Sequence, residues 1–227
     1  MTYQGMIFDF NGVLWWDSHL QEQAWREFAE ELFGISLTDA DMALEVHGRN
    51  NKHTLEFLAG TPLDPQQVKQ LSDQKERLYR ELCLAEGDGF RLSPGAIELL
   101  DALRDNGIPR TIATASGEEN IMFFIEHLNL ESWFDADQIL YDDGSRPGKP
   151  APDIYLQSAE RLGLLPGECV VVEDSKSGIQ AARSAGIGYI IAMLLDEKKL
   201  VILNDKVDLV VENLAQIPCG VLFNKSE

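Results

Sequence analysis

Three carboxylates come directly after two short apolar stretches of the chain. Asp9 follows a Met-Ile-Phe run, and Glu173 with Asp174 follows three consecutive valines. Such runs are typical of buried parallel strands, whose carboxyl ends meet at the sheet edge where ligands of open α/β sheets bind. Carboxylates that converge there would repel one another unless a divalent cation lay among them, and oxygen-only ligands suit Mg²⁺. One strand that ends in an acidic residue is common without a metal, but two in one chain favour a cation site.

Two further segments carry groups that could hold an anion beside these carboxylates. Thr114 ends another apolar run, and a hydroxyl next to backbone N–H groups at a strand-to-helix junction can bind phosphate. Ser116, with Glu119 three residues later, fits a helix capping box, which favours a structural role for this serine. Lys149 stands in a Gly-Lys-Pro-Ala-Pro-Asp loop, where prolines restrict the backbone and the ammonium could offset phosphate and carboxylate charge.

The elements that would position these residues fall into two groups. Residues 18–88 show helical periodicity without a strand signal, whereas strands and helices alternate after residue 93, which is the pattern of right-handed βαβ units. The sequence predicts an α/β, Rossmann-like doubly wound parallel sheet core of residues 1–16 and 89–227, with an all-helical cap of residues 17–88 inserted after the first strand. We expect later strands near 110–114, 137–141, 169–173, 187–192 and 208–211, and helices near 18–34, 39–47, 51–59, 65–82, 96–106, 118–129, 153–163 and 178–185.

Composition narrows the class of protein. Of 227 residues, 44% are hydrophobic, which is enough to fill a core, and 38 acidic against 19 basic residues give a net charge of −19. This charge argues against nucleic acid or an anionic membrane as a partner. The three cysteines, Cys83, Cys169 and Cys219, are far apart and form no CxxC pair, so we expect reduced thiols and a cytoplasmic protein.

The order of the four motifs resembles one family. Asp-x-Asn-Gly-Val near the start, a hydroxyl residue that ends the next core strand, Gly-Lys-Pro-x-Pro-Asp, and Glu-Asp-Ser-x-x-Gly together are similar to the haloacid dehalogenase-like (HAD) hydrolase superfamily. The resemblance covers essentially the whole chain, and it is strongest to the β-phosphoglucomutase and phosphoglycolate phosphatase-like branch. It implies a Mg²⁺-dependent hydrolase with a helical cap and a small phosphorylated metabolite as its substrate.

The resemblance also assigns roles to individual residues. Asp9 would attack phosphorus and form an aspartyl-phosphate. Asp174, with Glu173 and the main-chain carbonyl of residue 11, would hold the metal beside Asp9. The phosphoryl oxygens would be gripped by Thr114, the N–H of Ala115 and Lys149.

Asn11 departs from the family pattern. Phosphatases and mutases of this family carry a second aspartate there, which protonates the leaving oxygen and then deprotonates water, and an amide can do neither. General acid–base help is typically worth about 10²–10⁴ in rate, so we expect a slow enzyme or one that stalls as aspartyl-phosphate. Metal binding need not suffer, because residue 11 contributes only its main-chain carbonyl.

The expected cap contributes a candidate specificity loop. Gly48 would permit a tight turn, and Arg49 could reach a second anionic group of the substrate. Lys52 is a candidate for a Schiff-base lysine of the kind that phosphonoacetaldehyde hydrolases use, but a solvated helix lysine is the favoured interpretation.

Two functions from different classes therefore stay open. The first is a phosphatase of small phosphate monoesters, sugar phosphates among them, attenuated by Asn11. The second is a catalytically silent protein that binds a phosphorylated metabolite. Phosphoryl transfer as a mutase, or cleavage of a carbon–phosphorus or carbon–halogen bond, is a weaker alternative, since Glu173 and Asp174 argue against a metal-free dehalogenase.

Overall fold

The computed structural model describes residues 3–47, 49–194, 207–218, 220 and 223 of the chain. The chain divides into two compact units. Met1–Trp16 and Leu92–Glu227 together form the first, called here the core unit, and Asp17–Arg91 form the second, called the helical unit.

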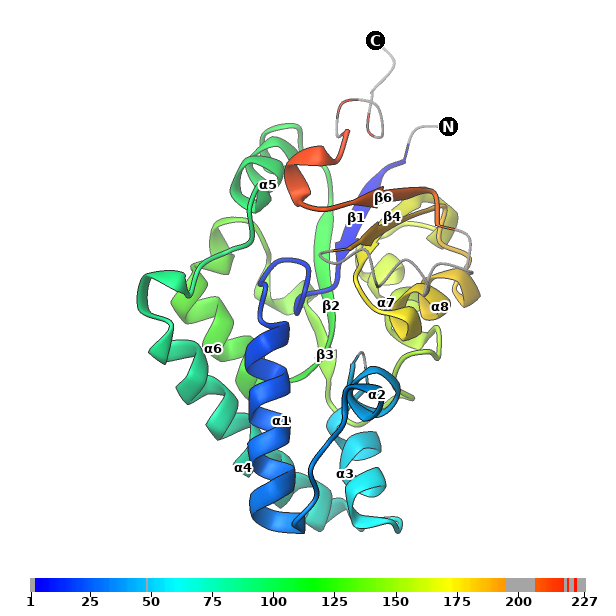
Figure 1. Cartoon of the computed structure of the whole chain (residues 1–227). Helices are drawn as coiled ribbons and strands as arrows, with labels where there is room; N and C mark the ends of the chain where they lie inside the picture. Colours follow the sequence, from blue (N-terminus) through cyan, green and yellow to red (C-terminus); the bar gives the residue numbers. More distant parts are fainter. Residues whose placement is uncertain (1–2, 48, 195–206, 219, 221–222, 224–227) are drawn as a thin grey trace. The chain divides into compact units, whose positions relative to one another are not determined.

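The described part of the core unit contains a parallel sheet of six strands, with the order β3-β2-β1-β4-β5-β6. The first strand lies in the middle, so strand order runs outward from it in both directions, and its carboxyl end is a topological switch point. This confirms the predicted α/β doubly wound fold. The strands are β1 (Gly5–Phe8), β2 (Arg110–Gly117), β3 (Leu140–Asp142), β4 (Cys169–Glu173), β5 (Tyr189–Met193) and β6 (Leu209–Val211), as Figure 1 shows.

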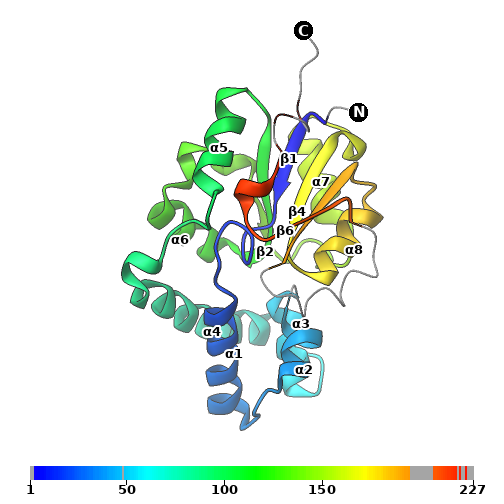
Figure 2. The same cartoon turned by 45° about the horizontal axis from the view of Figure 1, so that its top comes forward.

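Helices cover both faces of this sheet (Figure 2). Ile7 of β1 belongs to a buried cluster with residues of the two helices on one face, whereas the next residue, Phe8, packs edge-on against Phe134 at a centroid distance of 6.1 Å. Burial on both faces explains why β4 is apolar without alternation, since all its residues are buried. The helices on the face of Ile7 are α7 (Asp153–Arg161) and α8 (Lys176–Ser184), and those on the other side are α5 (Ala96–Asp105) and α6 (Glu118–Leu128).

The helical unit is built around its own apolar cluster, which includes Trp25, Phe28 and Leu55. Its longest helix begins with Pro65 directly after Asp64. The Asp64 side chain accepts the Gln67 N–H while the Gln67 side chain accepts the Asp64 N–H, which is a capping box. Among the helices that the structure describes, none combines the length and apolar character needed to cross a membrane. The elements are α1 (Ser18–Phe33), α2 (Asp39–Asp41), a π-helical turn (Met42–Val46), α3 (Asn51–Ala59) and α4 (Pro65–Ala85).

One local prediction is wrong. Ser116 does not cap α6, because β2 continues through Gly117, which itself occupies the N-cap position and has no side chain to accept a hydrogen bond. Parallel pairing with β3 extends the strand to this residue, with Gly117 opposite Asp142. Ser116 is therefore kept at the sheet edge, where its hydroxyl is available for another contact.

Candidate active site

The strand register brings the predicted carboxylates to one edge of the sheet. Phe8 of β1 lies opposite Ile112 of β2 and Val172 of β4, so the residues that follow it on the three strands are level with one another. The backbone N–H of Asp9 continues the ladder by donating to the carbonyl of Val172 at 3.0 Å. Asp9 and Glu173 are 7% and 0% exposed as whole residues, so both are largely shielded from water.

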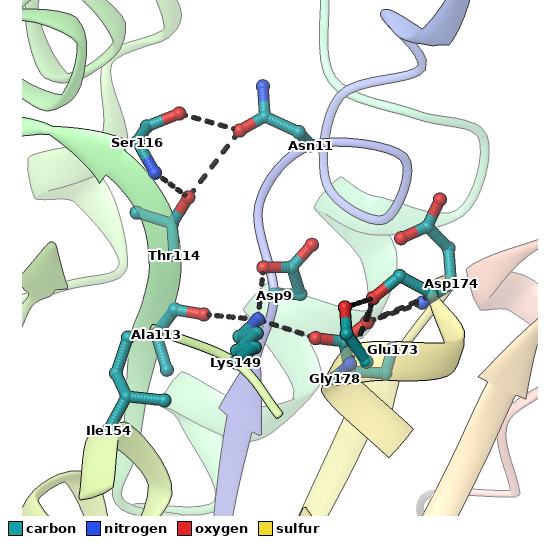
Figure 3. Close-up of polar contacts among 12 residues, drawn as sticks. Asp9, Asn11, Ala113, Thr114, Ser116, Lys149, Ile154, Glu173, Asp174 and Gly178 are labelled. Carbon is teal, nitrogen blue, oxygen red and sulfur yellow. Dashed lines mark hydrogen bonds and ion pairs between the residues drawn. The ribbon is translucent and has the colours of Figure 1, made fainter. Parts of the chain in front are cut away.

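Lys149 lies between these carboxylates (Figure 3). Its Nζ donates to Asp9 Oδ1 at 2.8 Å, to Glu173 Oε1 at 2.5 Å and to the Ala113 carbonyl at 3.2 Å, so all three ammonium protons have acceptors. Burial disfavours the charged ammonium, but the two carboxylates outweigh that effect and raise the pKa of Lys149 above its ordinary value. The side chain predicted to offset carboxylate charge is placed where it does so.

Glu173 is a buried anchor for this arrangement. Oε1 accepts from Lys149 and from the Tyr155 hydroxyl, which donates at 2.7 Å, while Oε2 accepts two backbone N–H groups and the hydroxyl of Ser175. Burial alone would raise its pKa, but Lys149 and these hydrogen bonds together lower it. A Cβ on Gly178 would overlap the Glu173 carboxylate, which explains the glycine of the Glu-Asp-Ser-x-x-Gly motif.

Asp9 has the opposite electrostatic environment. Burial is the main cause that raises its pKa well above the ordinary value, and the negative charges of Glu173 and Asp174 add to it against the opposing effect of Lys149. One ammonium cannot neutralise three neighbouring carboxylates. Asp9 is therefore a carboxylate that an added cation would help to ionise.

The carboxylate cluster fits a divalent cation. Asp9, Glu173 and Asp174 each offer an oxygen, and these oxygens all lie within 4.8 Å of one another. A Cβ on Gly12, whose φ is +77°, would overlap the Asp174 carboxylate, so this glycine lets Asp174 approach the turn that follows Asp9. Glu173 already accepts five hydrogen bonds, so its carboxylate has little capacity left to bind a hard ion such as Mg²⁺ directly.

Asn11 lies beside Thr114 and Ser116, apart from the acidic pair (Figure 3). Its Oδ1 accepts the hydroxyl of Ser116 at 2.8 Å and that of Thr114 at 3.4 Å. The Thr114 hydroxyl in turn accepts the backbone N–H of Ser116 at 3.1 Å. Ala115 stands between these two hydroxyl residues at the end of β2, so the segment predicted to hold phosphate reaches the same edge as Asp9.

The remaining candidate residues belong to the helical unit. Gly48 lies outside the described residues. Arg49 donates from Nε to the carbonyl of Leu44 at 3.4 Å, in the π-helical turn just before it. Lys52 pairs with Glu56 one turn later and its side chain is 59% exposed, which agrees with the solvated role favoured from the sequence.

Two site residues escaped prediction from the sequence. Tyr155 is fully buried and holds Glu173, and the only local signal is its position early in the helix that follows the Lys149 loop. Ser175 caps α8 by accepting the Gly178 N–H at 3.0 Å while its hydroxyl also donates to Glu173. A serine directly after two acids at a strand end is a recognisable N-cap signal, but its contact with Glu173 depends on the tertiary fold.

Comparison with known proteins identifies the family of this chain. The family model described as "haloacid dehalogenase-like hydrolase" matches residues 3–186. The chain therefore belongs to the haloacid dehalogenase-like hydrolase family, and it is a hydrolase, as the motifs predicted.

Individual relatives include phosphatases of phosphorylated carbohydrates. The chain is 32% identical to the phosphorylated carbohydrates phosphatase of Thermotoga maritima, over 81% of this chain and 82% of that one. It is 31% identical to hexitol phosphatase A of Escherichia coli K12, over 96% and 94% of the two chains. A solved HAD hydrolase of family IA, variant 3, from Entamoeba histolytica is 36% identical and superposes with a TM-score of 0.84 over 94% of this chain and 95% of that one.

Proposed function

We propose that this chain is a Mg²⁺-dependent phosphatase of small phosphate monoesters, sugar phosphates among them, which works through an aspartyl-phosphate on Asp9. The observation that carries the proposal is the buried Asp9 at the switch point of the sheet, held by Lys149 and flanked by the acidic pair and the Thr114 segment. The two relatives named for phosphorylated carbohydrates and hexitols support a phosphorylated carbohydrate as the substrate class.

The geometry supports a role for each residue. Lys149 holds Oδ1 of Asp9, which fixes the carboxylate so that its other oxygen is the one we assign to attack. In that step a bond forms between the Asp9 oxygen and phosphorus while the bond from phosphorus to the ester oxygen breaks. The phosphoryl oxygens would be held by Thr114, the N–H of Ala115 and Lys149. Lys149 can exchange its longest hydrogen bond, to the Ala113 carbonyl, for one to a phosphoryl oxygen.

Mg²⁺ would be held by Asp9, Asp174 and the main-chain carbonyl of Asn11, and Glu173 would support the site from its buried position next to them. The bound ion would supply positive charge that offsets the negative charge of the phosphoryl group. The raised pKa of Asp9 supports this assignment, because a nucleophilic carboxylate must be ionised and a cation favours that form.

Asn11 also supports the second candidate, a protein that binds a phosphorylated metabolite without turnover. The amide cannot take a proton from water, so hydrolysis of the aspartyl-phosphate would lack a base at this position. Turnover distinguishes the two candidates.

The test is hydrolysis of p-nitrophenyl phosphate and of a panel of hexose and hexitol phosphates, with Mg²⁺ and with EDTA. The wild-type chain is compared with Asp9→Asn, which keeps the side-chain shape, and with Asn11→Asp. We expect slow Mg²⁺-dependent turnover by the wild type, none by Asp9→Asn, and turnover about 10²–10⁴ faster by Asn11→Asp. Binding of phosphate and Mg²⁺ with no turnover by either the wild type or Asn11→Asp would replace this proposal with the binding-protein candidate.

A further inference from the structure

Asn11, which lies beside the Thr114 segment that we propose holds phosphate, carries no proton that it can transfer. Asn11 presents its amide oxygen to the hydroxyls of Thr114 and Ser116. The Thr114 hydroxyl already accepts the Ser116 N–H, so its remaining proton points to Asn11, which fixes the oxygen of the amide on that side. An amide in this position neither gains nor loses a proton over the working pH range of proteins.

The proton-bearing side chains that contact the Asp9 cluster are engaged elsewhere, among the described residues of the core unit. The three ammonium protons of Lys149 go to two carboxylates and a carbonyl. The Tyr155 hydroxyl donates to Glu173, which is 0% exposed and accepts five hydrogen bonds in all. Figure 3 places the Asp174 side chain beside Glu173, whereas Asn11 lies beside Thr114 and Ser116. The described core unit thus offers no acid to a departing oxygen on the Asn11 side.

We infer that the substrates of this site are phosphates whose departing oxygen is already stable as an anion: acyl, enol, aryl and anomeric sugar phosphates, in preference to primary-alkyl phosphates. This inference rests on the proposed function, since it assumes attack by Asp9. In the step, the Asp9 carboxylate forms a bond to phosphorus, the bond from phosphorus to the leaving oxygen breaks, and its electron pair stays on that oxygen. The products are the aspartyl-phosphate and a free carboxylate, enolate, phenolate or hemiacetal alkoxide, and any proton that the product later takes comes from solvent.

The preference has a measurable size. A general acid contributes about 10²–10⁴ to rate, and it contributes most when the leaving oxygen is most basic. The ratio of kcat/KM for p-nitrophenyl phosphate to kcat/KM for glycerol 3-phosphate should therefore be about 10²–10⁴ larger in the wild type than in Asn11→Asp. The parameter must be kcat/KM, because it reports the steps up to the phosphorylation of Asp9 and is insensitive to slow hydrolysis of the aspartyl-phosphate.

The experiment measures kcat/KM for acetyl phosphate, a series of substituted phenyl phosphates, glucose 1-phosphate, glucose 6-phosphate and glycerol 3-phosphate, all with Mg²⁺. The expected result is a steep fall with the basicity of the leaving oxygen in the wild type, and a shallower fall in Asn11→Asp. The wild-type series stands by itself if the variant folds poorly. A shallow wild-type series, with glucose 6-phosphate as good a substrate as glucose 1-phosphate, would overturn the inference.

Ser116→Ala is the matched control for the hydroxyl next to Asn11. We expect it to leave the dependence on the leaving group as steep as in the wild type, because Ser116 positions the amide and supplies no proton. A clearly steeper dependence in Ser116→Ala would show that this hydroxyl protonates the departing oxygen, and the inference would be wrong. Asp9→Asn separates the two proposals: residual turnover in that variant refutes the proposed function, whereas its loss together with a shallow wild-type series refutes only the substrate class.

Discussion

Replacement of Lys149 by methionine tests the buried charge arrangement at its centre. The Lys149 side chain is 3% exposed and its ammonium contacts two carboxylates that are 10% and 0% exposed. Methionine keeps much of the volume but removes the cation, so Asp9 and Glu173 would face each other without compensation.

The expected loss of stability is large for a single substitution. Removal of one partner from a buried ion pair typically costs about 3–5 kcal/mol, because the remaining charge stays buried. For a unit of this size that loss corresponds to a fall in Tm of about 6–20 °C. The penalty should shrink as the pH falls toward 5, because the pKa of Asp9 is already raised and protonation removes one of the two uncompensated charges.

The assay is thermal and urea unfolding in EDTA at pH 5 and pH 8, with Arg104→Met as the control in the same unit. Arg104 pairs with Asp101 on the surface of α5, where both side chains are nearly half exposed, and such pairs contribute about 0–1 kcal/mol. If Lys149→Met costs no more than Arg104→Met, or costs more at pH 5 than at pH 8, the account of the buried cluster is wrong.

Three further substitutions test neighbouring features. Gly178→Ala should lower the free energy of unfolding by about 1–3 kcal/mol and reduce activity, because the added Cβ would overlap the Glu173 carboxylate. An unchanged Tm together with unchanged turnover would show that Gly178 and Glu173 are not this close. Asp9→Asn should become more stable relative to the wild type in EDTA as the pH rises above about 4. The raised pKa of Asp9 means that the wild-type fold binds a proton there more tightly than the unfolded chain does, so the wild type loses stability as the pH rises and the asparagine variant does not. A stability difference that stays constant between pH 4 and pH 8 would show that the pKa of Asp9 is not raised. Ser175→Ala should lower the free energy of unfolding by about 0.5–2 kcal/mol, measured in urea, because it removes the N-cap of α8. Ser158→Ala, on the buried face of α7, is the comparison in which a serine hydroxyl is removed without loss of a cap.

The sequence predicted which candidate residues come together where their chemistry and the strand order coincide. Asp9, Glu173 and Lys149 sit next to apolar runs and prolines whose local structure is strongly determined, and parallel pairing of β1 with β2 and β4 then brings them together without further information. The valines of β4 and the glycine of the Glu-Asp-Ser-x-x-Gly motif have direct structural reasons of the same kind.

The contacts that the sequence did not predict depend on tertiary structure. Ser116 fits a capping box by spacing, but pairing of β2 with β3 carries the strand past it, and its hydroxyl binds Asn11 instead. Tyr155 reads as an ordinary core residue of α7, because nothing local indicates that its hydroxyl meets Glu173. Local propensity cannot find such contacts, since each joins elements that are far apart in the chain or folded together only by the sheet.

The most direct test of the central claim is whether Asp9 becomes phosphorylated. The wild-type chain would be mixed with acetyl phosphate and Mg²⁺, quenched in acid within seconds, and examined by intact mass and by peptide mapping after reduction of the acyl phosphate with borohydride. We predict a mass increase of one phosphoryl group, mapped to Asp9, which decays slowly in the wild type, decays faster in Asn11→Asp and is absent from Asp9→Asn. Turnover of a phosphate substrate without any label on Asp9, or a label that persists in Asp9→Asn, would contradict the account.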